Sequence, residues 1–383
     1  PAVPRNGAVD VLKALAIVGT VTIHASTAAY YDGFGSLPWL SAIFWGTISR
    51  WAVPVFFLCS GALLLDPDRD LSLRKLWGRN ILHILLAMWV WAFAYKVYGL
   101  LPGGVTLAGL WQGAKEVLLF HHEFHLYYLH ITLLVYALLP MTRLLARAER
   151  RTVEYLLILW LGLGILWPTF QGCWPLTLLT GIPRQWPLNL TYTCVGFTVL
   201  GWYLRVYAKN WKPWAALFAV GFLWSYGGTV YLTLRDGALN VDPLMGNHLG
   251  VALMAAGLGG WVFARMGDRP APRFCATLSQ ASFCIFLVHV FFLYGLRSLG
   301  LSALLCHPIV SIPLTAGAIL VCSFAVWLVL RRGSEFPVGV FSGGLSSRAA
   351  VEPHRRQKGK RILIRFSLLG KLSLNIIKNE NII

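Results

Sequence analysis

The sequence contains few charged residues and very few acids. Charged residues make up 13% of the 383 positions, and 15 Asp and Glu stand against 33 Lys and Arg. A soluble globular chain has roughly 25% charged and roughly 45–50% apolar residues, whereas 57% of this chain is hydrophobic. The composition excludes a soluble enzyme and a disordered chain. Because the basic residues are scattered between apolar runs, it also argues against a nucleic-acid partner.

Cysteines are also few, and they follow no pairing pattern. The seven cysteines are odd in number, lie mostly inside apolar runs and include no C-x-x-C, so neither a disulfide framework nor a cysteine zinc site is indicated. The histidine-rich segment 121–125 departs from H-E-x-x-H, because its second histidine follows Glu123 too soon. It is more typical of an interfacial belt or a sugar-facing vestibule, and we expect no metal.

Long apolar runs dominate the sequence instead. A helix needs roughly 20 apolar residues to cross the hydrocarbon core, and a span must satisfy its backbone hydrogen bonds within its own segment. The sequence therefore predicts an all-α, polytopic membrane protein with about ten transmembrane helices, at residues 8–30, 39–65, 77–99, 124–143, 153–170, 188–206, 213–233, 247–266, 274–297 and 308–330.

The loops between these predicted spans alternate in charge. Basic clusters follow every second span, within residues 69–79, 143–151, 205–212 and 265–273, whereas the other loops carry only scattered cations: Lys115, Arg184, Arg235 and Arg297. By the positive-inside rule both the N and C termini are expected in the cytoplasm. An even number of spans agrees with this orientation, in a multi-pass protein of the cell (inner or plasma) membrane.

The composition changes after Arg332. Residues 1–332 are predicted to form the transmembrane domain, and residues 333–383 a basic, disordered cytoplasmic tail that has no Trp or Tyr and few other aromatic residues. Its basic run at 355–365 is compatible with a segment that lies on anionic lipid. The tail is expected to be irrelevant to activity. Its first four residues, Gly-Ser-Glu-Phe, resemble a translated linker, so a non-native origin is an alternative to a native tail.

The first predicted span carries two ionisable residues on one face. Lys13 and His24 are 11 positions apart, a rotation of about 1100°, within about 20° of whole turns, and an axial distance of roughly 16 Å. Asp10 lies close enough to pair with Lys13. The pair is suited to holding the two ends of a long ligand. The alternative is that Lys13 reaches the headgroups and His24 is a hydrogen-bonded packing residue.

A third ionisable residue, Arg50, is expected near the membrane midplane. It lies about 11 residues, or roughly 16 Å, into the second predicted span. An arginine at that depth needs an anionic partner or a water-filled cavity. Few acids lie within the spans, so a bound anionic ligand is an alternative to a structural ion pair.

Four segments in order resemble membrane acyltransferase family 3, the integral-membrane O-acetyltransferases of surface glycans. The first, residues 5–24, contains the family pattern of a cation, ten residues and a histidine, here Lys13 and His24. The others are WAVPVFFLCSG at 51–61, FHLYYL at 124–129 followed by Tyr136 and Pro140, and residues 281–289, which end at His289. The similarity covers about residues 5–332.

The resemblance implies transfer of an acyl group, usually acetyl, from cytoplasmic acyl-CoA to a hydroxyl of a cell-surface or lipid-linked carbohydrate. In this interpretation His24 is catalytic, as a general base or as a covalent acyl carrier. Arg50 would stabilise the oxyanion or the acceptor. Acetyl-CoA would be a co-substrate, and carbohydrate and membrane lipids would be the other partners.

The remaining implied roles concern binding. Lys13, Lys75 and Arg79 would hold the phosphates of acyl-CoA, whereas His125, Tyr128 and His289 would contact the acceptor. A membrane exporter or transporter of a glycan or small anion is the competing interpretation, because charged residues near the midplane also line transport paths.

Overall fold

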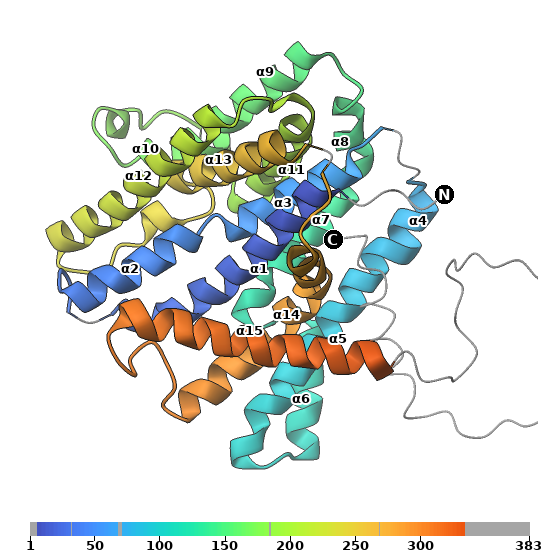
Figure 1. The fold of residues 1–383 in the computed structure, drawn as a ribbon, viewed down its shortest axis with the longest axis vertical. Coiled ribbons are helices and arrows are strands. Elements are labelled where there is room, and N and C mark those ends of the chain that lie inside the picture. Colours follow the sequence, from blue (N-terminus) through green and yellow to red (C-terminus); the bar gives the residue numbers. More distant parts are fainter. Residues whose placement is uncertain (1–5, 32, 68–70, 184, 268, 334–383) are drawn as a thin grey trace, which may run out of the picture.

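The computed structural model describes residues 6–31, 33–67, 71–183, 185–267 and 269–333, and it shows a helical bundle (Figure 1). Apart from Gly333, the predicted tail lies outside the described residues. The regular elements of the described part are all helical: α1 (Gly7–Ser26), η1 (Thr27–Ala29), α2 (Leu37–Ser49), α3 (Ala52–Leu64), α4 (Leu73–Lys75), η2 (Leu76–Ile81), α5 (Leu82–Leu100), η3 (Leu101–Gly103), α6 (Leu107–Leu118), η4 (Phe124–Leu126), α7 (Tyr127–Ala137), α8 (Leu139–Leu145), α9 (Arg150–Trp160), η5 (Leu161–Leu166), α10 (Trp167–Phe170), η6 (Leu176–Leu178), α11 (Leu190–Tyr207), α12 (Lys212–Asp236), η7 (Asp242–Leu244), α13 (Leu249–Met266), α14 (Arg273–Ser298) and α15 (Pro308–Gly333).

The all-α, polytopic architecture is confirmed. Among the described residues, eight helical segments are long and apolar enough to cross a membrane, or nine if one bent pair is a single span. The segment predicted at 188–206 does form a helix, α11, but it falls outside this set. Its threonines, its tyrosines and Arg205 lower its hydropathy.

The bent pair is the segment predicted as one span at 124–143. Phe124–Ala137 and Leu139–Leu145 meet at an angle of 62°. Pro140 stands in the first turn of α8. It cannot donate to the carbonyl of Tyr136, and its ring restricts the preceding residue. The chain therefore bends at this point.

The second predicted span is also interrupted, and the break lies at Arg50. α2 ends at Ser49 with Arg50 as its C-terminal cap, and α3 begins at Ala52. Pro54 has no N–H to donate to the Arg50 carbonyl four residues earlier. The Arg50 N–H donates to the Thr47 carbonyl, three residues earlier, at 3.1 Å, and not to the Gly46 carbonyl as in a continuous α-helix. Arg50 thus lies at a helix break and not within a continuous helix, which the sequence pattern did not predict.

α1 is the central helix of the bundle. It packs against α2, α3, α13, α14 and α15 (Figure 1), and most of its residues are buried. Asn6 begins it, because its side-chain oxygen accepts a hydrogen bond from the Val9 N–H at 3.0 Å. Near its start the Ser279 hydroxyl of α14 donates to the buried Asp10 carboxylate at 2.8 Å. α1 is thereby fixed to α14.

Small residues allow α3 and α11 to approach closely. A Cβ atom at Gly201 of α11 would lie 2.0 Å from the Leu58 carbonyl oxygen of α3, and one at Gly61 would lie 1.6 Å from the Thr198 carbonyl oxygen. Such contacts between helix backbones are typical of membrane bundles, where dispersion and close packing drive helix association. The pair anchors the α3 half of the second span.

Loop cations gather at the end of the bundle where α1 begins, which we call the basic end. Arg205 lies 3.2 Å from the Asp66 carboxylate, and Arg143 donates to the Asp66 carbonyl at 3.0 Å. Gly7 lies against the backbone of residues 269–271. The opposite end of the bundle, where α1 and α14 end, is called the cavity end below.

The close contact of α3 with α11 generates a stability prediction. Gly201→Ala is expected to destabilise the protein by about 1–3 kcal/mol, because its methyl group would meet a backbone carbonyl that only a helix shift can relieve. Gly227→Ala on α12 is the matched control, since a Cβ there has nothing within 4 Å. Thermal unfolding in detergent should show a lower Tm for Gly201→Ala alone. Equal Tm values for the two variants would contradict the packing described above.

Candidate active site

Three histidines from distant parts of the chain meet beside the C-terminal half of α1. His24 lies on α1, His125 on η4 and His289 on α14. The ring centroids of His24 and His289 are 5.2 Å apart, and those of His125 and His289 are 5.4 Å apart. Phe124 packs edge-on against His24 at 5.2 Å. The structure thus brings together three of the histidines that the sequence singled out.

Backbone contacts define the tautomer of His289. Its Nδ1 lies 2.7 Å from the Phe286 carbonyl oxygen. A carbonyl can only accept, so Nδ1 carries the hydrogen and Nε2 is left as an acceptor. That Nε2 is buried and has no hydrogen-bond partner among the described residues. His289 therefore offers a lone pair in the immediate neighbourhood of the His24 ring.

Unpaired buried polar atoms concentrate around this cluster. Both ring nitrogens of His125 and the Nε of Arg50 are buried without a hydrogen-bond partner in the described part of the chain. Each such atom costs about 1–3 kcal/mol in a folded interior. Binding sites are places where such a cost is offset by a ligand. The cluster is suited to receiving polar groups of a bound molecule.

Arg50 belongs to the same neighbourhood. It is half-buried at the break between α2 and α3, and it interacts electrostatically with both His24 and Tyr127. His24 also interacts electrostatically with His289 and His125. None of these three neighbours of His24 is a carboxylate. The site is therefore a histidine and arginine cluster, unlike a Ser-His-Asp triad in which an acid orients the histidine.

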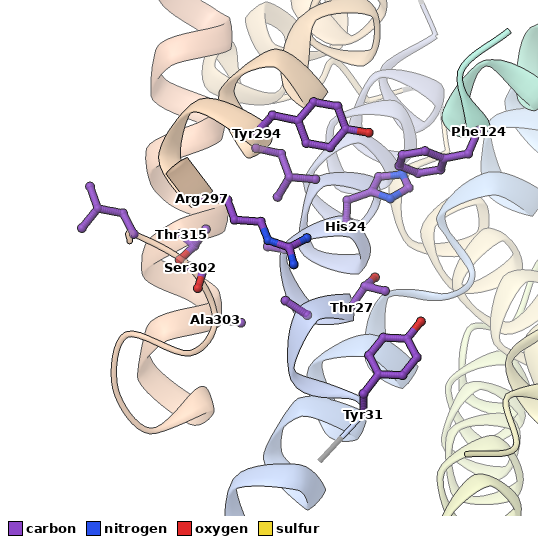
Figure 2. A pocket seen from close by; sticks show the side chains of 13 residues that line it. His24, Thr27, Tyr31, Phe124, Tyr294, Arg297, Ser302, Ala303 and Thr315 are labelled. Carbon is purple, nitrogen blue, oxygen red and sulfur yellow. The ribbon is translucent and has the colours of Figure 1, made fainter. Parts of the chain in front are cut away.

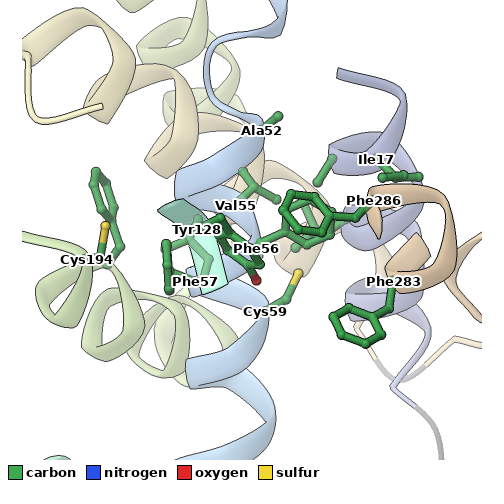
Figure 3. Close-up of a cluster of buried hydrophobic side chains, with 14 of the residues drawn as sticks. Ile17, Ala52, Val55, Phe56, Phe57, Cys59, Tyr128, Cys194, Phe283 and Phe286 are labelled. Atoms are coloured by element: carbon green, nitrogen blue, oxygen red, sulfur yellow. The ribbon is translucent and has the colours of Figure 1, made fainter. Parts of the chain in front are cut away.

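Tyr128 lies deeper, in the aromatic core. Figure 3 shows Phe56, Tyr128 and Phe286 reaching toward one another from α3, α7 and α14. The Tyr128 ring lies 5.1 Å from Phe57 and 5.2 Å from Phe286, centroid to centroid. Its ring packs among the phenylalanines next to the histidine cluster. Tyr128 does not line the cavity that opens beside His24.

A cavity of about 340 Å³ opens beside His24 at the cavity end of the bundle (Figure 2). This volume is at the lower end of the roughly 300–1,000 Å³ typical of small-molecule sites. Its walls come from α1, η1, η4, α14, α15 and the segment between α14 and α15. The lining residues are His24, Ala25, Thr27, Ala28, Tyr31, Phe124, Leu293, Tyr294, Arg297, Leu301, Ser302, Ala303 and Thr315.

The three residues predicted to bind the donor phosphates lie away from this cavity. Lys13 is buried in α1, where it and Asp10 interact electrostatically with Cys59. Lys75 and Arg79 are exposed on α4 and on the π-helix η2. That segment follows the loop after α3, so it belongs to the basic end. The structure thus separates the predicted donor cations from His24 along the length of α1.

Two further histidines lie near the cluster but form a separate pair. His122 Nε2 lies 2.9 Å from the Val117 carbonyl, so Nε2 carries the hydrogen, and His122 Nδ1 accepts from His130 Nε2 at 3.0 Å. Burial lowers the pKa of His122, which favours the neutral ring that this bond requires. The described residues contain no group of three or more His, Cys, Asp or Glu side chains placed to hold a metal ion.

Several cavity residues were missed by sequence reasoning. Tyr294, Arg297 and Ser302 line the cavity with His24, yet none belongs to a recognisable motif. The signal for Arg297 was present, because it is one of the few cations in the sparsely charged set of loops. No spacing rule could have placed it beside His24, since the two residues are on different helices.

The fold and the site together define an integral-membrane acyltransferase. Residues 6–332 match the family model of the acyltransferase domain, and the chain belongs to membrane acyltransferase family 3. No curated protein and no solved structure matches the chain. Because the match covers nearly the whole of the described chain, it supports acyl transfer and disfavours the exporter interpretation.

The geometry of His289 leads to a spectroscopic prediction. In protein labelled with ¹⁵N-histidine, solid-state NMR is expected to show His289 as the Nδ1–H tautomer, because Nδ1 faces the Phe286 carbonyl. The signal is assigned by its loss in His289→Gln. An Nε2–H tautomer at this residue would contradict the arrangement, since Nε2 would then no longer be an acceptor beside His24.

Proposed function

We propose that the protein transfers an acyl group, most simply acetyl, from cytoplasmic acyl-CoA to a hydroxyl of a cell-surface or lipid-linked carbohydrate. The observation that carries the proposal is the position of His24. It lines the cavity, while the same helix carries Lys13 toward the basic end, 11 residues or roughly 16 Å away. One helix thus connects a cationic donor region to a cavity that suits an acceptor.

The orientation of the bundle follows from its charges. We place the basic end in the cytoplasm of a cell or inner membrane, because lysine and arginine clusters remain on the cytoplasmic side. In this arrangement the N-terminal end of α1 and the C-terminal end of α15 both lie at the basic, cytoplasmic end. The cavity then faces the opposite side, where surface glycans are found.

The donor cations suit the charge of acyl-CoA. Lys75 and Arg79 are exposed and one helical turn apart at the start of the third span, and Lys13 lies further along the path toward His24. Phosphates bind lysine and arginine through charge-assisted hydrogen bonds. π-Helical segments such as η2 are frequent at functional sites. The pantetheine arm would carry the thioester from this end toward the histidine cluster.

His24 acts as the general base in the simplest route. It takes the proton of the acceptor hydroxyl, whose oxygen attacks the thioester carbonyl, and Arg50 stabilises the resulting oxyanion. The tetrahedral intermediate then breaks its C–S bond, and the leaving CoA thiolate receives the proton from His24. His289 Nε2 is an acceptor that can orient the protonated ring. In the second route His24 itself takes the acyl group before passing it to the acceptor.

Loss of the His24 ring is expected to abolish catalysis. In purified protein supplied with acetyl-CoA and a glycan acceptor, His24→Ala should lower kcat by at least about 100-fold, the smaller effect expected for a general base. His121→Ala is the matched control, because His121 is exposed and lies outside the cavity lining. Full transfer by His24→Ala would refute the assignment. Ping-pong kinetics in the wild type would indicate the acyl-histidine route.

The donor assignment has its own test. The double variant Lys75→Ala, Arg79→Ala is expected to raise KM for acetyl-CoA by about tenfold, because two phosphate contacts are lost. Lys209→Ala, Lys212→Ala removes the same charge from exposed positions at the same end and is the control. An equal rise of KM in both double variants would show that only the general surface potential matters.

A further inference from the structure

Among the described residues that line the cavity beside His24, one is a permanent cation, and it comes from a different helix. Arg297 lies in the last turn of α14 and lines the cavity together with His24. Figure 2 shows its side chain reaching into the space between Ser302 and His24. No aspartate or glutamate is among the lining residues that the structure describes. Arg297 therefore gives the described wall of the cavity a positive charge at neutral pH.

Within the described part of the chain, this guanidinium has no anionic partner. No carboxylate of the described residues forms an ion pair with Arg297. Glu123 interacts electrostatically with the cavity residue Tyr294, but its carboxylate lies 3.9 Å from the Lys96 ammonium. Lys96 also holds Glu116 at 2.9 Å, which lowers the pKa of Glu116 through their hydrogen bond. Glu116 and Glu123 are thus both directed toward Lys96.

A helix-capping role alone does not account for Arg297. A cation in the last turn of a helix interacts favourably with the helix dipole, and Arg235 occupies the same place at the end of α12. Arg235, however, pairs with Asp236 at 2.6 Å and lines no part of the cavity. Arg297 shares the helix position of Arg235 but is directed into the cavity, and no described carboxylate pairs with it.

The remaining walls of the cavity suit a sugar. Thr27, Tyr31, Tyr294 and Ser302 contribute hydroxyl groups, and Phe124 contributes an apolar ring face. The Thr27 hydroxyl donates to the Ile23 carbonyl at 2.9 Å, so its oxygen remains an acceptor. A mostly apolar wall with a few placed polar groups is the usual form of a small-ligand site. The volume of about 340 Å³ suits one sugar unit and not a long oligosaccharide.

We propose that the acceptor is an anionic carbohydrate, carrying a carboxylate or a phosphate that Arg297 binds while a hydroxyl of the same sugar unit lies at His24. This inference rests on the proposed function and adds the charge class of its acceptor. A guanidinium presents paired N–H donors that match the oxygens of either group. Arg297 is thus a specificity-determining residue, separate from the donor cations at the basic end.

The test compares acceptors that share one sugar ring and differ at C6, where the neutral probe carries a hydroxyl and the anionic probes a carboxylate or a phosphate. Purified protein in lipid nanodiscs receives acetyl-CoA and one of three probes: methyl glucoside, methyl glucuronoside or methyl glucoside 6-phosphate, with the corresponding galactosides as a second set. For the wild type, kcat/KM is expected to be at least about tenfold higher for an anionic probe than for its neutral counterpart. The better of the two anionic probes shows whether the charged group is a carboxylate or a phosphate.

The variants assign this preference to one side chain. Arg297→Gln should reduce the ratio of anionic to neutral kcat/KM to near unity, and Arg297→Lys should retain part of it, because lysine keeps the charge without the paired donors. Arg235→Gln, the matched change at the end of α12, should keep the wild-type ratio. A loss of the ratio in Arg235→Gln as well, or its persistence in Arg297→Gln, would overturn the role of Arg297.

The outcomes separate this inference from the proposed function. One outcome is that acetyl transfer depends on His24 but is equally fast for neutral and anionic probes. This outcome supports the proposed function and refutes the anionic acceptor. If the wild type transfers acetyl to none of the probes, neither the carbohydrate acceptor of the proposed function nor this inference stands.

Discussion

The structure depends on the requirement that backbone polar groups within a bilayer find partners inside the protein. This requirement makes the described spans helical. It also explains why Pro54 and Pro140, which have no N–H to donate, interrupt the spans in which they lie. Pro54 leaves the Arg50 carbonyl without its helical donor, so the second span breaks where a cation enters the interior. α1 has no such break between Gly7 and Ser26. It therefore keeps Lys13 and His24 at a separation that helix geometry sets.

In the described part of the chain, buried polar groups are hydrogen-bonded near the start of α1 but lack partners near its end. Near its start the Asp10 carboxylate accepts from Ser279 at 2.8 Å, which joins α1 to α14. Near its end, His125 and His289 keep buried nitrogens without partners among the described residues. A stable core satisfies its polar atoms, whereas a site must leave some available for a substrate. The unsatisfied atoms lie beside the cavity, which is where the chemistry is proposed.

Much of the fold was predictable, because helix length and charge asymmetry are local properties of the chain. The all-α class, most of the spans and the shared face of Lys13 and His24 follow from apolar run length and from 100° per residue. The break at Arg50 and the bend near Pro140 were in principle visible from their prolines, although a hydropathy pattern averages over them. The π-helical segments Leu76–Ile81 and Leu161–Leu166 left no such signal.

By itself the sequence determined the membrane class, the helical spans, the basic clusters of alternate loops and the residues that resemble family 3, all through spacing along one chain. Only the tertiary structure decided that His24, His125 and His289 meet, that Tyr128 belongs to the aromatic core, and that Arg297 shares a cavity with His24. The physical reason is that distances within a helix are set by local backbone geometry. Contacts between helices depend instead on which surfaces can approach, as Gly61 and Gly201 allow α3 and α11 to do.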